Sequence, residues 1–514
     1  MTRLSACLLV LLFACPVDSV HGELSVASLF SDHMVIQQGQ TLKVWGWGDA
    51  SRTVTVQLGA HTQQATVSED GRWSLQIAPP SDVGPHVLQI GDGQTSLTIN
   101  DVLVGEVWLC SGQSNMAMTV SRAQDFETEQ AAAYLPQIRM FHVASAHASE
   151  PQATCRGEWT VCAPDTVGRF SATAFFFGRR LHSELNVPVG LINSSVGGTS
   201  VESWTSLPAQ TAVAAIQPRL KAWQQSDAEF DEAAAQARFD KALARWTKDA
   251  QQARESGKRV PRRPKLAARP REDRNYPASL FNGKIHPLIG YSLRGAVWYQ
   301  GENSSGRGFA HLYGPQLTTL VRDWRARWGA DFPFAWVQLP NYRAAQKEPV
   351  EPNGWTLVQE GMLQTLAEPH TGMAITLDVG EARDIHPKNK QAVGYRLAQW
   401  ALADVYQGDL IPMGPIYRDH VIANGKVTIT FDHAAGLMST TDKVQGFAIC
   451  GADRKFVWAD AVIDGTQVIV SSEAVPEPVA VRYAWAANPV FSLYNKAQIP
   501  ASPFRTDTWE EQGR

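Results

Sequence analysis

The sequence has little excess charge and, after its first residues, no long hydrophobic run. Its 514 residues include 46 Lys and Arg and 50 Asp and Glu, which gives a formal net charge of −4. A balanced chain lacks the basic surface that binding to nucleic acid requires. No later stretch is long and apolar enough to form a membrane-spanning helix. We therefore expect neither a nucleic-acid partner nor insertion into a membrane.

Cysteine is also scarce, with six in the whole chain, which excludes a disulfide scaffold. Beyond the N-terminal segment the cysteines are Cys110, Cys155, Cys162 and Cys450. Cys155 and Cys162 are close enough to close a short loop, and we expect them to pair; the alternative is two free buried thiols. No CxxC, no HExxH and no cluster of His, Asp and Glu occurs, so we expect no metal and no cofactor.

The first residues have the pattern of a secretory signal. Arg3 supplies a positive start, Leu4–Cys15 is apolar, and Val20–Gly22 is a usable cleavage site. This predicts a signal peptide over residues 1–22 and an exported protein, periplasmic or secreted. Lipid anchoring at Cys15 is the less favoured alternative, because the residues around it match a lipoprotein signal poorly.

Both ends of the remaining chain have the two-residue period of strands. Thr53–Leu58 and Trp73–Ile77 alternate between polar and apolar residues, and so does Lys426–Phe431 near the other end. Turn residues interrupt these runs at short intervals, as in small antiparallel sandwiches. We expect an N-terminal β-sandwich over residues 23–100 and a C-terminal one over residues 406–514.

Between these ends, residues 101–405, apolar strand-like runs alternate with helical patterns. The expected strands are Val102–Leu109, Val187–Asn193, Gly295–Tyr299, Phe332–Leu339 and Met373–Asp378. The expected helices are Phe175–Leu185, His311–Trp328 and Gln391–Ala403. This alternation predicts an α/β fold, a mostly parallel sheet covered on both faces, in which the loops after the strands carry the chemistry.

An insertion over about residues 206–276 interrupts this scheme. Ala209–Ala253 reads as helical, and Arg254–Arg274 is rich in basic residues and proline. A basic lid or docking arm is one interpretation. A solvated insertion on the outside of the domain is favoured, since a charge run is usually a surface in water.

The strongest chemical signal is the turn that follows the first central strand, Cys110-Ser111-Gly112-Gln113-Ser114-Asn115-Met116. A serine there is presented at the carboxyl edge of the sheet, although serine is also a common helix cap. A hydroxyl attacks poorly without a base. Asp384 and His386 follow another strand and supply a base and its carboxylate partner in the order Ser, Asp, His. The alternative is a surface histidine beside an ion pair.

Acyl transfer also needs donors for the developing oxyanion. Asn193–Thr199 is a glycine-containing turn after a strand, and Trp298–Asn303 places amide side chains after another. Each segment alone is equally typical of a tight structural loop. Four polar segments at the strand ends of one sheet favour a shared functional site over four unrelated structural loops.

Several blocks resemble the sialate O-acetylesterase family, a branch of the SGNH hydrolases. The resemblance covers nearly the whole chain outside the insertion, and its blocks are Leu29–Val35, Val44–Trp47, Gly112–Met116, Leu191–Thr199, Leu280–Gly283, Trp298–Glu302, Asp384–Pro387, Ala484-Trp485 with Asn488-Pro489, and Leu493–Asn495. It implies an SGNH-type, doubly wound parallel sheet flanked by the two β-sandwiches. It also implies a serine carboxylic-ester hydrolase that removes acetyl esters from sialic acids.

Carried over by position, the resemblance assigns Ser114 as nucleophile, His386 as base and Asp384 as its orienting carboxylate. It assigns the oxyanion hole to the N–H groups of Ser114 and Gly198 and to an amide of the third block. The family commonly has Gly-Glu-small-Asn there, whereas this chain has Gly301-Glu302-Asn303-Ser304. Both Gln300 and Asn303 therefore remain candidates for that amide.

Two other functions are compatible with the sequence. An acetylated xylan or another plant polysaccharide could replace sialic acid as the substrate. Alternatively, two sandwiches and 17 tryptophans could belong to a glycan-binding protein without activity, although the intact Ser114, Asp384 and His386 argue against it. In every case the expected partner is a sugar, acetylated if the protein is an enzyme. The oligomeric state stays open.

Overall fold

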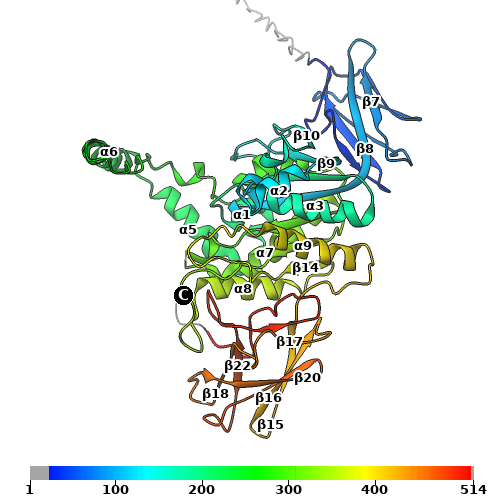
Figure 1. The fold of residues 1–514 in the computed structure, drawn as a ribbon. Helices are drawn as coiled ribbons and strands as arrows, with labels where there is room; N and C mark the ends of the chain where they lie inside the picture. Colours follow the sequence, from blue (N-terminus) through cyan, green and yellow to red (C-terminus); the bar gives the residue numbers. More distant parts are fainter. Residues whose placement is uncertain (1–21, 307, 511–514) are drawn as a thin grey trace, which may run out of the picture.

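The computed structural model describes residues 22–306 and 308–510. All but the last residue of the expected signal peptide, including Cys15, lies outside these residues. Figure 1 shows three tiers, with the first strands at one end, an α/β layer in the middle and the last strands at the other end. The expected α/β fold is therefore confirmed at this coarse level.

The N-terminal tier consists of short antiparallel strands. One sheet has the order β1 (Ser25–Val26), β3 (Leu42–Trp47), β6 (Arg72–Ile77). A second group pairs β5 (His61–Thr66), β4 (Thr53–Leu58) and β7 (His86–Gly91). In β4 the three apolar residues are buried and the polar ones between them are not, so the period of two places one face against a core.

Strand β8 (Ser96–Gly112) joins the N-terminal tier to the middle tier without a linker. Its first residues pair with β7, its middle pairs with β2 (Val35–Gln37), and its last seven residues pair with β11. The expected domain boundary at residue 100 thus lies inside a single strand. The rest of the division into domains stays a prediction.

The central sheet has the order β10-β9-β11-β8-β12-β13-β14. Its strands are parallel except for β10, which is antiparallel to β9. Their bounds are β9 (Leu135–His142), β10 (Trp159–Cys162), β11 (Val189–Ser195), β12 (Gly295–Tyr299), β13 (Phe334–Val337) and β14 (Thr371–Ala374). Strands β9 and β10 were not predicted from the sequence; in β9, Pro136 and Arg139 interrupt the apolar pattern.

Helices cover both faces of this sheet. Trp108 of β8 meets Phe177 of α3 (Ala172–Leu185) at 5.0 Å and Trp400 of α9 (Lys390–Trp400) at 6.2 Å between ring centroids. Trp298 of β12 meets Trp324 of α7 (Tyr313–Trp328) at 5.9 Å on the opposite face, where α8 (Gly354–Thr365) packs on α7. These tryptophans are fully buried, so they belong to the core.

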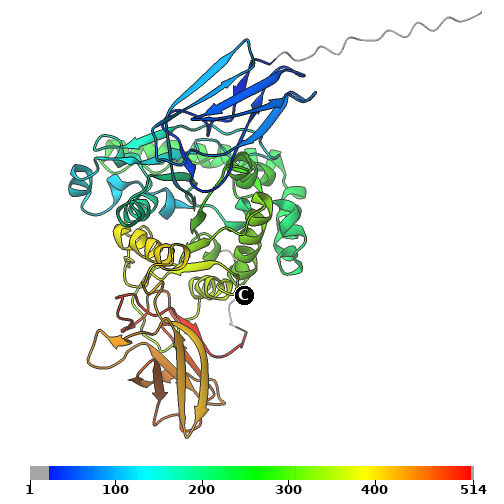
Figure 2. The same ribbon diagram turned by 90° about the vertical axis from the view of Figure 1, so that its right-hand side faces the viewer.

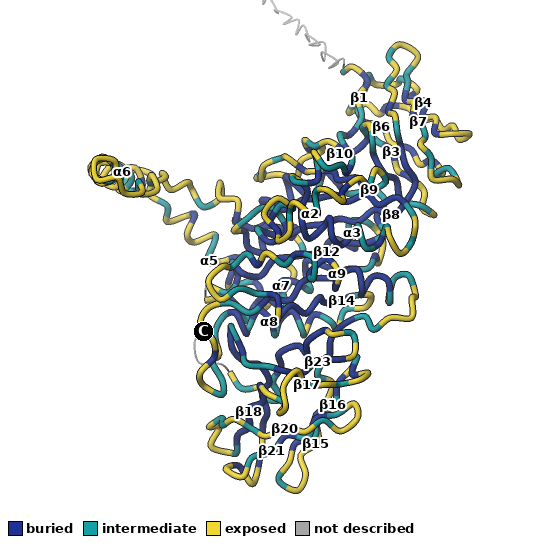
Figure 3. Tube along the Cα trace, in the orientation of Figure 1, coloured by how far each residue is buried: buried dark blue, intermediate teal, exposed yellow. Residues whose placement is uncertain are grey.

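The insertion forms α4 (Leu207–Thr211), α5 (Gln217–Ala228) and α6 (Glu232–Glu255). Helix α6 projects from the body and is exposed along its length (Figures 1 and 3). Ala235 and Ala250 are its buried residues. Such a helix buries little apolar surface, and its role as a solvated insertion stays a prediction.

The C-terminal tier lies at the end of the molecule opposite the first strands (Figure 2). It contains a four-stranded antiparallel sheet, a second four-stranded sheet and a two-stranded one. The first sheet is β15 (Ile416–Ala423), β16 (Lys426–Asp432), β21 (Gln467–Ser471) and β20 (Asp460–Asp464). The second is β19 (Val457–Trp458), β18 (Phe447–Cys450), β22 (Ala480–Tyr483) and β24 (Phe504–Arg505), and the pair is β17 (Met438–Ser439) and β23 (Leu493–Tyr494). Phe504 stacks on Tyr417 at 4.7 Å between ring centroids, which packs β24 of one sheet on β15 of the other.

The expected Cys155–Cys162 disulfide is wrong. All four described cysteines are free and buried. The Cys155 sulfur lies 3.3 Å from the hydroxyl of Ser28, whereas the Cys162 thiol donates to the carbonyl of Ala133. Proximity in sequence did not bring the two thiols together, because Cys162 ends strand β10 whereas Cys155 precedes this strand and lies beside Ser28.

Within the described residues, no helix is long and apolar enough to cross a membrane.

Candidate active site

Ser114 lies where the central sheet changes winding direction. Strand β8 has β11 on one side and β12 on the other, and chain segments leave the sheet on both sides of its carboxyl end. Ligand sites of open α/β sheets form at such switch points. A Cβ at Gly112 would come within 2.2 Å of the Tyr299 carbonyl oxygen, so only glycine fits there. The chain then turns, and half-buried Ser114 begins the short helix α1 (Ser114–Ala117).

The glycine block after β11 lies directly against this serine. The N–H of Val196 donates to the carbonyl of Gly112 at 3.0 Å. A Cβ at Gly197 would be 3.2 Å from the Ser114 Cβ. Gly198 has a φ of +71°, which favours glycine. Among the described residues, the N–H groups of Ser114 and Gly198 donate to no acceptor, so both remain open to a ligand.

The third block places its two candidate amides differently. Gln300 is fully buried, and its amide nitrogen donates to the Thr199 carbonyl at 3.0 Å and to the Ser304 hydroxyl at 3.2 Å. Its side-chain oxygen accepts a hydrogen bond from Tyr313. With both N–H bonds used, Gln300 fastens its loop to the glycine block.

Asn303 is the amide beside Gly198. Its Nδ2 donates to the Gly198 carbonyl at 2.9 Å, and its backbone N–H donates to the Gln113 side chain at 3.3 Å. Its Oδ1 is buried without a partner among the described residues. One N–H of the Asn303 amide is therefore still free, next to the open N–H of Gly198.

Asp384 and His386 lie on the loop after β14. The Asp384 carboxylate accepts the backbone N–H of His386 at 2.9 Å, and the same oxygen lies 3.5 Å from Nδ1 of the ring. In the described part of the chain, no hydrogen bond joins the Ser114 hydroxyl to the His386 ring. Catalytic hydrogen bonds are often long before substrate binds.

Asn115 holds the serine turn against the histidine loop, a link that the sequence analysis did not find. Its Nδ2 donates to the Ile385 carbonyl at 2.9 Å and to Glu302 at 2.6 Å. Lys390 donates from Nζ to Asn115 Oδ1 and to the Pro387 carbonyl, both at 2.7 Å. Asn115 directly follows Ser114, and Ile385 directly precedes His386, so the bridge brings the two loops together.

A partial signal for this bridge was present in the sequence. Asn115 and Glu302 stand inside the two motifs already singled out, and Lys390 follows His386 by four positions. Their types, an amide between a carboxylate and an ammonium, fit a buried network. Only the fold reveals that the three side chains meet.

Burial shapes the charges of this site. It lowers the pKa of Lys390 to about 7 against the opposing effect of Glu302. It also raises the pKa of Glu302, a shift reduced by the hydrogen bond from Asn115. The pKa of His386 lies below its ordinary value because partial desolvation outweighs the attraction of Asp384. A histidine with a lowered pKa is neutral near pH 7, the form that accepts a proton.

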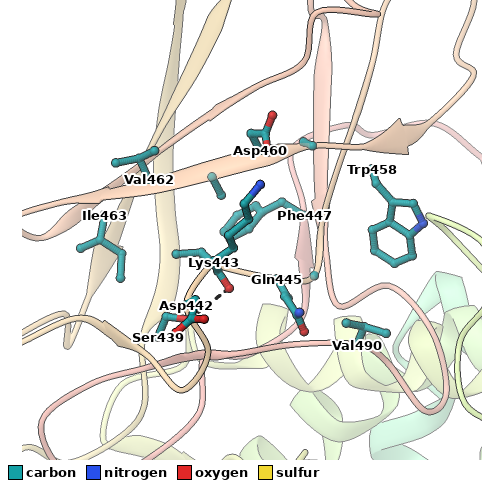
Figure 4. Close-up of a pocket in the computed structure, with 14 residues that line it drawn as sticks. Ser439, Asp442, Lys443, Gln445, Phe447, Trp458, Asp460, Val462, Ile463 and Val490 are labelled. Carbon is teal, nitrogen blue, oxygen red and sulfur yellow. Dashed lines mark hydrogen bonds between the residues drawn. The ribbon is translucent and has the colours of Figure 1, made fainter.

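A hollow of about 780 Å³ in the C-terminal tier does not compete with this site. Figure 4 shows Trp458, Asp460 and Lys443 around it. Histidine is absent from the described residues that line it. Its serine, Ser439, donates to the carbonyl of Lys443. The hollow therefore lacks a nucleophile paired with a base.

Known proteins match this chain over most of its length. A family model described as carbohydrate esterase, sialic acid-specific acetylesterase, matches residues 104–255. The sialate O-acetylesterase of Rattus norvegicus is 29% identical, over 93% of this chain and 93% of the relative. The sialate O-acetylesterase of Homo sapiens is 28% identical, over 93% and 91%. The crystal structure of a carbohydrate acetylesterase from Xanthomonas citri is 33% identical with a TM-score of 0.79, over 95% of this chain and all of that one.

These matches identify a hydrolase that acts on acetyl esters, and the structure gives it a mixed α/β architecture. The chain belongs to the carbohydrate acetylesterases, as its 33% identity to the Xanthomonas citri enzyme shows, and it is similar to the mammalian sialate O-acetylesterases.

Proposed function

We propose that this protein removes acetyl groups from O-acetylated sialic acid through a covalent acetyl-Ser114 intermediate. The observation that carries the proposal is the Asn115 bridge, with hydrogen bonds to Ile385 and Lys390, which holds the Ser114 turn beside the His386 loop. The names of the mammalian relatives and of the family model support the choice of substrate.

Each proposed residue has one step in the reaction. The Ser114 hydroxyl oxygen attacks the acetyl carbonyl carbon while His386 takes its proton. Asp384 orients the imidazole and stabilises its cation. The ester C–O bond then breaks, and His386 returns the proton to the departing sugar alcohol. Water, activated by the same histidine, hydrolyses acetyl-Ser114 to acetate and free serine.

The developing oxyanion requires donors that are free when the substrate arrives. We assign the N–H groups of Ser114 and Gly198 and the remaining Nδ2 hydrogen of Asn303 to this role. Gln300 is a poorer choice, because both of its N–H bonds already have acceptors. Loss of one such donor typically costs about 3–4 kcal/mol of transition-state stabilisation. Asn303→Ala should therefore lower kcat far more than KM.

Acetate release from O-acetylated sialic acid tests the nucleophile. Ser114→Ala should lower the rate by several orders of magnitude, and rapid quenching of the wild type should trap an acetyl group on the peptide that contains Ser114. Ser121→Ala is a matched control, because Ser121 is an exposed serine near the same turn. Equal rates for wild type and Ser114→Ala would contradict the mechanism.

A wider carbohydrate substrate is the second candidate. The Xanthomonas citri relative is described as a carbohydrate acetylesterase without reference to sialic acid. A panel of acetylated sialic acids, xylo-oligosaccharides and other plant glycans, with identification of the deacetylated position, separates the two. Preference for a neutral plant glycan would favour this candidate.

The finer architecture and the location belong to the same proposal. We infer an SGNH-type core flanked by two β-sandwich domains, supported by the order of the central sheet and by the strands at both ends. Export through residues 1–22 stays a prediction. Mass measurement of the mature N-terminus would test both cleavage after Gly22 and lipidation at Cys15.

A further inference from the structure

Arg274, at the end of the insertion, reaches the glycine block of the candidate active site. A Cβ built at Gly198 would lie 3.4 Å from its terminal nitrogen Nη2. The side chain is exposed, and it donates to no acceptor among the residues that the structure describes. A free guanidinium therefore stands next to an open N–H of the proposed oxyanion hole.

The backbone around Arg274 is fastened to the same block. Asn275 accepts the backbone N–H of Ser200 at 2.9 Å through Oδ1, and the Ser279 hydroxyl donates to the Arg274 carbonyl at 2.7 Å. The nearest acidic side chain in sequence, Asp273, accepts from the backbone and side chain of Asn275 instead of from Arg274. The backbone at Arg274 is thus anchored to the glycine block, while no carboxylate in the described part of the chain pairs with its guanidinium.

A free arginine at the edge of a site selects for particular ligands. Its planar fork of donors matches a carboxylate in two parallel hydrogen bonds, and its charge persists at every physiological pH. A second exposed arginine, Arg122, is near enough to His386 to help lower its pKa. Two cations, one near Gly198 and one near His386, favour an acidic substrate over a neutral one.

We propose that Arg274 binds the carboxylate of an acidic sugar and thereby determines the preference of the site for acidic over neutral acetylated sugars. This inference rests on the proposed acetylesterase function. In sialic acid the carboxylate is on C2 and the acetylated glycerol side chain is on C6, the two carbons on either side of the ring oxygen. A carboxylate held by Arg274 and an ester held at Ser114 would fix the sugar at two points.

The test compares an acidic with a neutral acetyl ester. We expect Arg274→Ala to lower kcat/KM for O-acetylated sialic acid at least about tenfold more than for acetylated xylo-oligosaccharide, mainly through KM. Arg274→Lys should restore part of the loss, because lysine keeps the charge but lacks the fork. High salt should weaken the acidic preference of the wild type.

Arg259→Ala serves as the control, because it removes the same charge from an exposed position elsewhere on the insertion. It should leave both substrates unaffected. Two results would overturn the proposal. Equal losses of kcat/KM on both substrates in Arg274→Ala would indicate direct oxyanion stabilisation or structural damage instead. An unchanged kcat/KM on both substrates would show that Arg274 does not take part in recognition.

A failure of the proposed acetylesterase function would give a different result from a failure of the Arg274 proposal. If the wild type released no acetate from O-acetylated sialic acid, the substrate assignment would fail. The same comparison on O-acetylated galacturonate, another acidic sugar, would still decide whether Arg274 recognises a carboxylate.

Discussion

At the scale of single residues, Asn115 defines the site as much as the three proposed catalytic side chains do. It spans 270 positions of the chain to reach the Ile385 carbonyl. Ser114 and His386 are each adjacent in sequence to one end of this hydrogen bond. The hydrogen bonds that hold Asn115 therefore also hold the Ser114 turn and the His386 loop in place relative to each other.

The pH dependence of the reaction follows from His386. The base must be neutral, and its pKa lies below the ordinary value near 6.5 because of burial. We expect the acid limb of kcat/KM to have its midpoint below pH 6.5. Asp384 raises this pKa, so Asp384→Asn should shift the limb to lower pH and reduce turnover by about 10⁴-fold. A limb that stays in place in Asp384→Asn would remove Asp384 from the assignment.

Lys390 is the residue on which the bridge depends. Lys390→Met should leave Asn115 Oδ1 and the Pro387 carbonyl without their donor, at a cost of about 1–3 kcal/mol per buried group. It should lower kcat by loosening the histidine loop while KM changes little. Steady-state kinetics measure kcat and KM, and thermal unfolding measures the loss of stability. Lys388→Met, an exposed neighbour on the same loop, is the matched control; equal effects of the two substitutions would contradict a positioning role.

The same lysine predicts a pH effect on stability. Its pKa is about 7 in the folded protein and near 10.5 when unfolded. Between these values the unfolded chain binds more protons, so the contribution of Lys390 to the free energy of unfolding rises with pH across that interval. Chemical denaturation at several pH values should show a smaller rise in Lys390→Met than in the wild type. An unchanged slope would mean that Lys390 is charged in the fold.

At the scale of elements, the insertion divides into a projecting part and an anchored part. Asp227 forms ion pairs with Arg269 and Arg271, which brings the two ends of the projecting part, residues 229–268, together. The segment from Pro270 to Ser279 contacts the candidate site, because Asn275 accepts a hydrogen bond from Ser200 and Arg274 lies next to Gly198. The two parts should therefore tolerate change very differently.

Excision of residues 229–268, with a short glycine linker from Ala228 to Arg269, tests this division. We expect a folded protein with a melting temperature within a few degrees of the wild type, because α6 buries little. Acetate release from small substrates should change by less than about twofold if the projecting part is only a solvated insertion. Selective loss of activity on polymeric glycans would instead identify it as a docking arm.

At the scale of the whole molecule, the single strand β8 connects the N-terminal tier to the central sheet that carries the candidate active site. Glu106 in this strand is fully buried and accepts hydrogen bonds from Gln37, Gln38, Arg294 and Tyr406. Gln37 also accepts the backbone N–H of Val107 at 2.8 Å. Removal of the first tier would therefore leave polar groups unpaired in the interior of the central sheet.

Truncation at the predicted boundary puts this to the test. A chain that begins at Asp101 should fail to accumulate as a folded protein, since it loses β2, β7 and the start of β8. Soluble yield and circular dichroism of the truncated chain are the measurements. A stable, active product would show that the boundary at residue 100 separates independent domains.

The amino-acid sequence alone determined the alternation of strands and helices and the residue types of the site. The period of apolar residues is set by near neighbours, so Thr53–Leu58 and Gly295–Tyr299 were predicted with the bounds that the structure has. Only the tertiary structure decided that Asn303 instead of Gln300 faces Gly198, that Cys155 and Cys162 stay apart, and that Arg274 reaches the glycine block. These outcomes depend on sheet order and loop paths, which bring distant residues together and which local periodicity does not encode.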